Sequence, residues 1–170
     1  MSATSPILLT LAILLSLAGC SRQFAVTVNN RSIYDPRFPE GTRQVADSGL
    51  QGCLNLALNQ GSIQDVAELT VLACPAAEIS DLRGIGQLAG LQFLDLAANR
   101  ISDLQPLAEL SRLRGLSLPD NVITDISPLF AMPGLNAVIL TGNPGISCSQ
   151  LARLEQRLGP NLTRPSSCRN

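Results

Sequence analysis

The stretch NRISDLQPL, residues 99–107, decides the fold because it nearly recurs on both sides of itself. Ile79-Ser-Asp-Leu82, Ile101-Ser-Asp-Leu104 and Ile123-Thr-Asp-Ile126 follow one another at a constant step of 22 residues. A fixed internal period of this length is typical of solenoids, in which each repeat buries its apolar side against the next. The sequence therefore predicts a repeat protein whose leucines lie between neighbouring turns.

Each 22-residue repeat begins with the pattern L-x-x-L-x-L-x-x-N-x-I, which occupies residues 91–101 and 113–123. Residues 135–143 follow it as far as the asparagine, with a valine in the second leucine slot. Residues 69–79 fit with Cys74 in a leucine slot and Ala77 in the asparagine slot, as suits a terminal repeat. This pattern resembles the leucine-rich repeats, and the 22-residue step with the form ISDLxPLAxL is most similar to the internalin-type subclass.

The repeat spacing also predicts which side chains face the core. Alternation over residues 93–97 points Leu94 and Leu96 inward and leaves the residues between them on a concave surface. Asn99 then turns the chain, and its amide can bond the backbone of the neighbouring turn. The return leg after it brings four apolar side chains back inward through short helical turns, namely Ile101, Leu104, Leu107 and Leu110.

Helical segments are expected at both ends of the repeats. Ser48 and Gln51 have the spacing of a capping box, and so do Ser147 and Gln150, whose helix ends at Gly159-Pro160. Residues 24–34 alternate around Asn29-Asn30 and predict a β-hairpin. The expected fold is thus α/β: a leucine-rich-repeat solenoid of about four turns, with short parallel strands, a 3-10 or helical convex side, a preceding β-hairpin and helical caps at both ends.

The first twenty residues, MSATSPILLTLAILLSLAGC, differ in composition from the rest. Their apolar run has the length of a signal-peptide core and is too short for a comfortable membrane span. Leu17-Ala-Gly-Cys20 resembles the lipobox of bacterial lipoproteins, although no Lys or Arg precedes the apolar run. The resemblance implies removal of residues 1–19, diacylation of Cys20, anchoring in the lipid bilayer and, with Ser21 next, the outer membrane of the cell envelope. We expect five segments: 1–19 signal peptide, 20–44 tether with hairpin and linker, 45–68 N-terminal cap, 69–145 repeats and 146–170 C-terminal cap.

Five cysteines are an awkward number in an oxidising compartment, where unpaired thiols are rare. If Cys20 carries lipid, four remain, and they permit three pairings. We favour Cys53–Cys74 and Cys148–Cys168, because these bonds would close the two ends of the repeat region.

Composition limits the function classes. All twelve cationic residues are Arg and the net charge is −1, so the composition does not indicate a basic surface for binding nucleic acid. The chain has no His, which removes the usual general base and the commonest metal ligand. It also lacks GxSxG, GxxxxGK[ST] and CxxC motifs, and we expect no enzyme, no cofactor and no metal. Asp81, Asp103 and Asp125 each open a helical turn, which favours local capping bonds over a cation site.

The concave strands are the most plausible binding platform, and Phe93 is their only aromatic side chain, beside a dent expected at Gly115. A neutral sheet that tolerates any small outward residue remains an alternative. We expect a non-catalytic protein-binding module in the bacterial envelope, with an unknown protein or other macromolecule as ligand. A structural subunit of an envelope complex and a host-cell adhesion factor are the alternatives. The candidate binding residues are Val71, Phe93, Asp95, Gly115, Ser117 and Ile139.

Overall fold

The structure, a computed structural model, describes residues 26–28, 31–34, 45–61 and 65–168. The chain divides into two compact units, Met1–Gly41 and Thr42–Asn170, which are described separately. The expected signal peptide, the acylated Cys20 and the link over residues 35–44 lie outside the described residues.

The first unit contains a pair of antiparallel strands. β1 (Val26–Val28) pairs with β2 (Arg31–Tyr34), and Val28 lies opposite Arg31. The register shifts between Val26 and Thr27, which marks a bulge. The strands agree with the predicted hairpin, whose turn at residues 29–30 is outside the described part of the chain.

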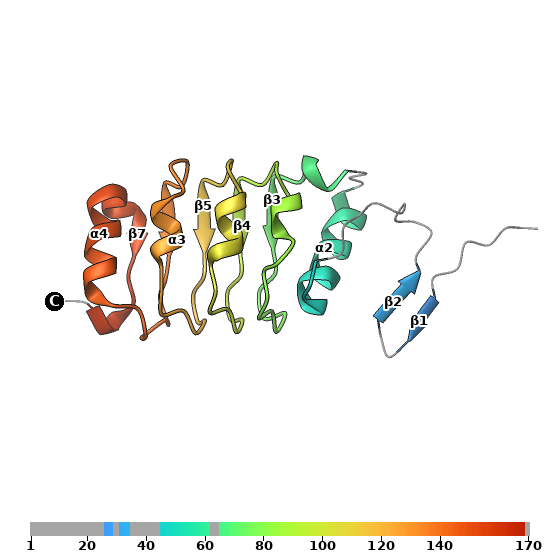
Figure 1. The fold of residues 1–170 in the computed structure, drawn as a ribbon, viewed down its shortest axis with the longest axis horizontal. Helices are drawn as coiled ribbons and strands as arrows, with labels where there is room; N and C mark the ends of the chain where they lie inside the picture. The colour runs from blue at the N-terminus through green and yellow to red at the C-terminus, as the bar shows by residue number, and fades with distance from the viewer. Residues whose placement is uncertain (1–25, 29–30, 35–44, 62–64, 169–170) are drawn as a thin grey trace, which may run out of the picture. The chain divides into compact units, whose positions relative to one another are not determined.

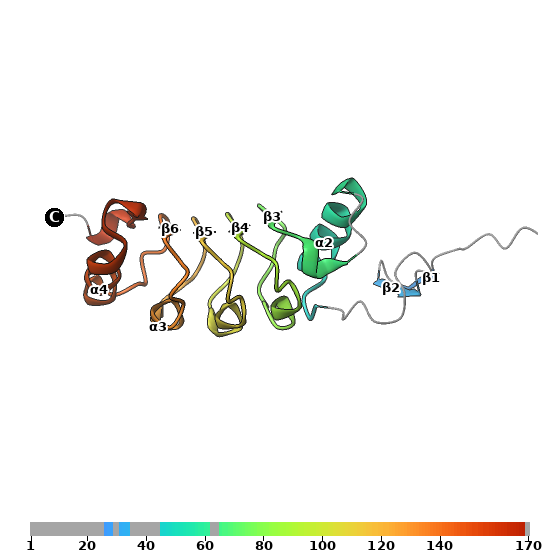
Figure 2. The same ribbon diagram turned by 90° about the horizontal axis from the view of Figure 1, so that it is seen from above.

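The second unit is built on a parallel sheet of five short strands in chain order. Figure 1 shows the strands side by side, and Figure 2 shows them along one side of the unit with the helical segments along the other. Paired residues occupy equivalent positions of successive repeats, as in Val71 opposite Phe93 and Phe93 opposite Gly115. The arrangement is an α/β leucine-rich-repeat-like fold. Its strands are β3 (Val71–Ala73), β4 (Phe93–Asp95), β5 (Gly115–Ser117), β6 (Ala137–Ile139) and β7 (Leu162–Thr163).

The convex side consists of short helical segments. The segment η1 (Val66–Glu68) precedes β3. After β3 comes η2 (Ile85–Gln87), after β4 comes η3 (Gln105–Glu109), and after β5 comes α3 (Ser127–Phe130). Asp65 caps η1, whereas η2 begins after Gly84, and η3 and α3 have Pro in their first turn. The apolar residues of the return leg are buried beneath them, as predicted, including Ile101, Leu104, Leu107 and Leu110.

Asparagine side chains connect each turn to the next inside the unit. Asn121 donates from Nδ2 to the carbonyl of Leu96 at 3.0 Å and to that of Leu118 at 3.3 Å. Its Oδ1 accepts from the N–H of Ile101 at 3.0 Å. Asn99 and Asn143 make the corresponding bonds one repeat before and one after. The asparagine turns are therefore structural, and their buried backbone groups are satisfied.

Helix α2 (Ser48–Gly61) lies before β3, and its N-cap differs from the prediction. The cap is Asp47, whose Oδ1 accepts from Gly49 and Leu50, rather than Ser48. Its Oδ2 accepts from the N–H of Ser80 at 2.9 Å, which ties the helix to the first repeat. Since that partner is 33 residues away, the local capping pattern could not reveal it. Gln51 reaches back to the N–H of Val45 instead of completing a box with Ser48.

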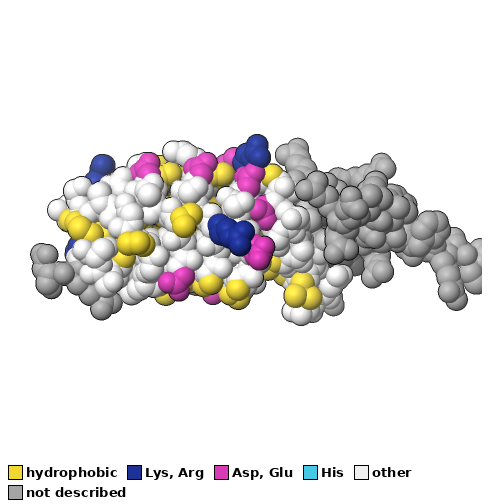
Figure 3. Space-filling view, turned by 90° about the horizontal axis from the view of Figure 1, so that it is seen from below, with side chains coloured by type: hydrophobic (Ala, Val, Ile, Leu, Met, Phe, Trp, Pro, Cys, Tyr) yellow, Lys and Arg dark blue, Asp and Glu magenta, His cyan; other side chains and the backbone are white. Residues whose placement is uncertain are grey.

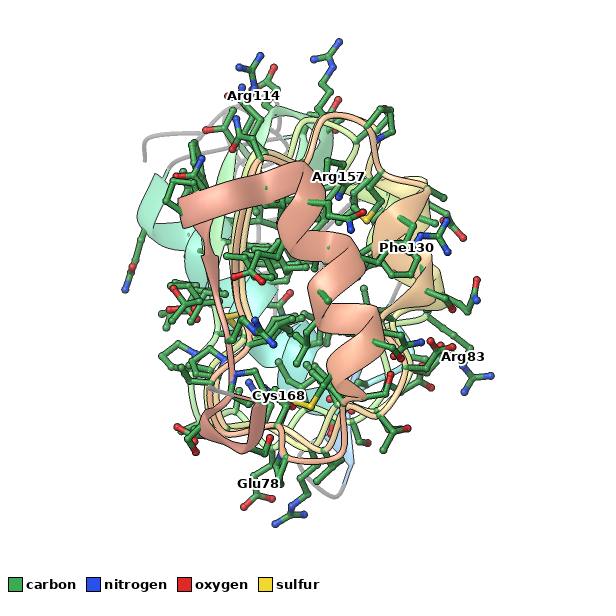
Figure 4. All side chains as sticks on the ribbon, turned by 90° about the vertical axis from the view of Figure 1, so that its left-hand side faces the viewer. Glu78, Arg83, Arg114, Phe130, Arg157 and Cys168 are labelled. Atoms are coloured by element: carbon green, nitrogen blue, oxygen red, sulfur yellow. A yellow bond between two sulfur atoms is a disulfide. The ribbon has the colours of Figure 1, made fainter. Side chains whose placement is uncertain are left out.

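Helix α4 (Cys148–Leu158) lies at the other end and begins at the predicted residue. Ser147 Oγ accepts from the N–H of Gln150, and the helix ends at Gly159 with φ of 55°. Figure 4 shows Arg157 of α4 and Phe130 of α3 on the same side of the molecule. Arg157 donates to the carbonyls of Leu129 and Met132, so α4 is held against the preceding repeat.

Both favoured disulfides are present. Cys53 of α2 bonds to Cys74, which follows β3, with a Cα–Cα distance of 5.7 Å. Cys148 of α4 bonds to Cys168 with a Cα–Cα distance of 5.5 Å. Each bond joins an end helix to residues 20 or 21 positions away in the chain.

The C-terminal region contains one element that the sequence analysis missed. After α4, the chain forms η4 (Gly159–Asn161), the strand β7, and η5 (Ser166–Cys168). β7 pairs with β6 through Leu162 opposite Val138. Residues 146–170, expected as helical only, thus extend the parallel sheet. The strand has two residues and only Leu162 turns inward, which is too short for an alternating pattern.

Candidate binding surface on the concave sheet

Two rows of side chains cover the concave face of the sheet. The register places the first residues of successive strands next to one another, and the third residues form a parallel row. The first row is Val71, Phe93, Gly115 and Ala137, and the second row is Ala73, Asp95, Ser117 and Ile139.

Large apolar side chains are exposed on these rows, although the residues between them are core. Phe93 is 49% exposed, Val71 57% and Ile139 40%, whereas Leu94 is 2% exposed. A folded chain gains free energy by burying such side chains, at about 25 cal/mol per Å² of apolar surface. Their exposure together on one face of the sheet favours a role outside folding.

The ring of Phe93 lies over Gly115 on the neighbouring strand. A Cβ built at residue 115 would be 2.7 Å from Phe93 Cδ1 and 3.1 Å from Cε1. The ring thus occupies the space that a side chain at residue 115 would take, and Gly115 also lines the open depression described next. Only glycine at this position leaves the ring room to lie along the sheet.

These side chains line one open depression of about 240 Å³, hereafter the concave depression. Its floor consists of strand residues from β3 to β6. All six sequence-predicted residues line the depression, so the structure brings them together on one surface. The lining residues include Val71, Phe93, Asp95, Gly115, Ser117 and Ile139.

A second groove, of about 500 Å³, adjoins the concave depression. It lies between α2 and β3 and shares Val71 and Ala73 with the concave depression. Leu56, which is 57% exposed, lies on its helical wall. Leu56 is not among the residues predicted from the sequence. The sequence shows that Leu56 lies outside the apolar stripe of its helix, but it does not show that Leu56 faces a groove. That stripe consists of Leu50, Cys53, Leu54, Ala57 and Leu58.

Asp95 is the one charged residue that lines the concave depression. Its Oδ1 accepts a hydrogen bond from the N–H of Ala97 at 3.0 Å, which orients the carboxylate on the sheet. Within the described ranges, no Lys or Arg forms a salt bridge with it. Its charge is therefore available to a ligand in the depression.

The other aspartates of the repeats act locally, as predicted. Asp81, Asp103 and Asp125 each accept at Oδ1 from the backbone N–H two residues later, at 2.9 Å. The side chain of Arg83 lowers the pKa of Asp81, and bonds from Ser127 and Gln150 lower that of Asp125. In the part of the chain that the structure describes, no group of His, Cys, Asp or Glu has the arrangement of a metal site.

Charged side chains are scattered over the face in Figure 3, where basic side chains lie among acidic ones. Figure 4 places Arg114 and Glu78 at opposite ends of the strands. Of the described helices, none has the length and apolar composition that a bilayer span requires.

Comparison with known proteins gives structural neighbours only. The sequence matches no protein-family model and no curated protein. A crystal structure of an internalin (inlF) from Listeria monocytogenes is 26% identical with a TM-score of 0.60, over 71% of this chain and 37% of that one. An internalin C2 (inlC2) from the same species is 22% identical with a TM-score of 0.53, over 61% of this chain and 52% of that one. The chain thus spans about a third to a half of these proteins, and the likeness supports an internalin-like leucine-rich-repeat fold.

Proposed function

We propose that the chain is a lipid-anchored protein of the bacterial envelope whose leucine-rich repeats bind another protein without catalysis. The concave depression is the binding site, and acylated Cys20 is the anchor. Four repeat turns, closed by α2 and α4 as caps, form the rigid platform. The internalin-like fold of the neighbours supports a protein-interaction module.

One observation carries the binding proposal: three exposed large apolar side chains gather on the concave face of the sheet. Of the five exposed large hydrophobic residues in the described ranges, Val71, Phe93 and Ile139 line the concave depression. Leu56 lies in the adjoining groove, and only Val122 lies in neither. Protein interfaces concentrate aromatic and apolar anchors in this way.

The anchor proposal has a different basis, the sequence LAGC at residues 17–20. Two or more acyl chains hold a protein firmly at a bilayer, whereas one chain holds it weakly. Mass spectrometry of the purified protein tests this directly. The expected product starts at Cys20 and carries diacylglycerol, and Cys20→Ser moves the protein out of the membrane fraction. Recovery of the unprocessed chain without lipid would contradict the anchor and leave the binding proposal intact.

Cross-linking in intact envelopes tests the binding proposal. The native protein is compared with a Phe93→Glu, Ile139→Glu variant of equal thermal stability, after reversible cross-linking and purification. Val122→Glu is the matched control, because Val122 is 57% exposed but lies off the depression. We expect a partner with the native and control proteins that the double variant loses. Retention of the same partner by all three proteins would overturn the assignment to the concave face.

A further inference from the structure

Phe93 and Asp95 form a pair suited to one cationic side chain. They lie two residues apart on β4 and project to the same face of the sheet, so their Cα atoms are about 7 Å apart. A guanidinium within about 6 Å of an aromatic ring is attracted by its face. A side chain stacked on Phe93 is therefore within reach of the Asp95 carboxylate.

The molecule already uses half of this arrangement on its convex side. There the guanidinium carbon of Arg153 lies 4.4 Å from the centroid of the Phe130 ring. On the concave side Phe93 is 49% exposed, more than the half-buried Phe130, and the carboxylate of Asp95 lines the same depression. The planar guanidinium of Arg both stacks on rings and binds carboxylates in a fixed geometry, which Lys does less well.

Apolar side chains flank the pair on both sides. Val71 lies on β3, one strand from the pair, and Ile139 lies on β6, two strands from it. The two are three strand spacings apart and in different rows, so their Cα atoms are about 16 Å apart. An extended peptide advances about 3.4 Å per residue, so the first and fifth residues are about 14 Å apart and their side chains can reach both apolar positions. Its first, third and fifth side chains face the sheet.

From this arrangement we infer that the concave depression recognises an extended peptide segment with an arginine between two apolar residues, spaced two positions apart. The arginine binds between the Phe93 ring and the Asp95 carboxylate, and the apolar residues contact Val71 and Ile139. This inference rests on the proposed function and names the class of its partner.

Synthetic peptides provide the test with the full-length protein. The probe is acetyl-Leu-Ser-Arg-Ser-Leu-amide, and its matched control has citrulline in place of arginine, which keeps the shape and removes the charge. We expect the arginine peptide to bind about 10-fold more tightly at low salt. The ratio falls as salt rises, because the pair is partly exposed.

Two variants locate the effect. Asp95→Asn keeps an oxygen for the N–H of Ala97 and should reduce the ratio to about 3-fold or less, leaving the stacking on Phe93. Asp120→Asn removes an exposed carboxylate from the turn after β5 and should leave the ratio unchanged. Equal binding of both peptides, or no binding at millimolar peptide, overturns the inference. The proposed function fails separately, by retention of the cross-linked partner in the Phe93→Glu, Ile139→Glu variant.

Discussion

The aromatic ring of Phe93 lies across Gly115 of the next strand, where a Cβ would be only 2.7 Å from Cδ1. The glycine therefore determines where the one aromatic side chain of the concave depression can lie. Gly115 should contribute little to the free energy of folding, because the ring that it positions is half exposed and glycine does not stabilise a strand.

Gly115→Val should therefore separate binding from stability. The new side chain displaces the ring, and we expect partner capture to fall at least several-fold. Since Val favours strands, the melting temperature should stay the same or rise. Thr163→Val, on β7 and outside the residues that line the concave depression, is the control and should retain the partner. Normal capture by Gly115→Val would show that the position of the ring is unimportant.

Asn121→Ala tests the side-chain ladder inside the repeats. The substitution leaves the buried N–H of Ile101 without its partner. It also removes one of two asparagine donors from the carbonyls of Leu96 and Leu118, which keep their bonds from Asn99 and Asn143. We expect the free energy of unfolding to fall by about 2–4 kcal/mol. Urea denaturation measures it, with Asn136→Ala as an exposed control that should change it by less than about 0.5 kcal/mol.

The residue before each ladder asparagine has a left-handed backbone. Ala98 and Asp120 have φ of 55°, and only the third repeat has glycine there, Gly142 with φ of 71°. A residue other than glycine in this conformation destabilises the folded state by about 1–2 kcal/mol. Part of this cost is offset because its unfolded chain has less conformational entropy to lose than a chain with glycine.

Ala98→Gly should for this reason raise the free energy of unfolding by about 0.5–1 kcal/mol. The same substitution at Ala108, inside the 3-10 segment η3, should lower it by about 0.5–1 kcal/mol. Urea midpoints of the two variants give the comparison. Destabilisation by both would contradict strain at residue 98.

The two disulfides should contribute stability independently. Each closes a loop of 20 or 21 residues, for which the chain-entropy model gives about 3 kcal/mol. We expect the Cys53→Ala, Cys74→Ala and Cys148→Ala, Cys168→Ala double variants to lose about this amount each. The quadruple variant should lose the sum, because the bonds lie at opposite ends. Equal stability of oxidised and reduced native protein would contradict this.

Acid should weaken the contact between α2 and the first repeat. Burial alone would raise the pKa of Asp47, but the N–H groups of Ser80, Leu50, Asp81 and Gly49 lower it below its usual value. A carboxyl whose folded pKa is the lower one contributes stability above its unfolded pKa of about 3.9 and loses it as pH falls through the folded value. The urea midpoint should fall more between pH 7 and strong acid for the native protein than for Asp47→Asn. An equal fall in both proteins would exclude Asp47 as a source of acid sensitivity. In Asp47→Asn we expect a smaller fall in the urea midpoint to remain, because the pKa values of Asp81 and Asp125 are also lowered.

The repeat region was predictable because its pattern is local and redundant. Each inward leucine recurs at a fixed step, so Leu94 and Leu116 could be assigned to the core without knowledge of the fold. The same register located the outward residues, including Phe93. The position of the Phe93 ring was not predictable, since it depends on a contact between two strands.

The features that the sequence analysis missed depend on contacts between distant residues. Asp47 caps α2 and bonds to Ser80 at once, and a window around the helix start shows only the first role. β7 is a strand because β6 offers it a free edge, not because of its own two residues. Leu56 looked like an ordinary exposed residue until the groove beside β3 showed what it faces.

The most direct test of binding at the concave depression is photo-cross-linking from a single position. A photoreactive phenylalanine analogue replaces Phe93 in one variant and Phe130, on convex α3, in the other, and both are irradiated in intact envelopes. The account predicts a specific adduct with a partner protein from residue 93 and none from residue 130. Adducts from residue 130 alone, or the same adducts from both positions, would contradict it.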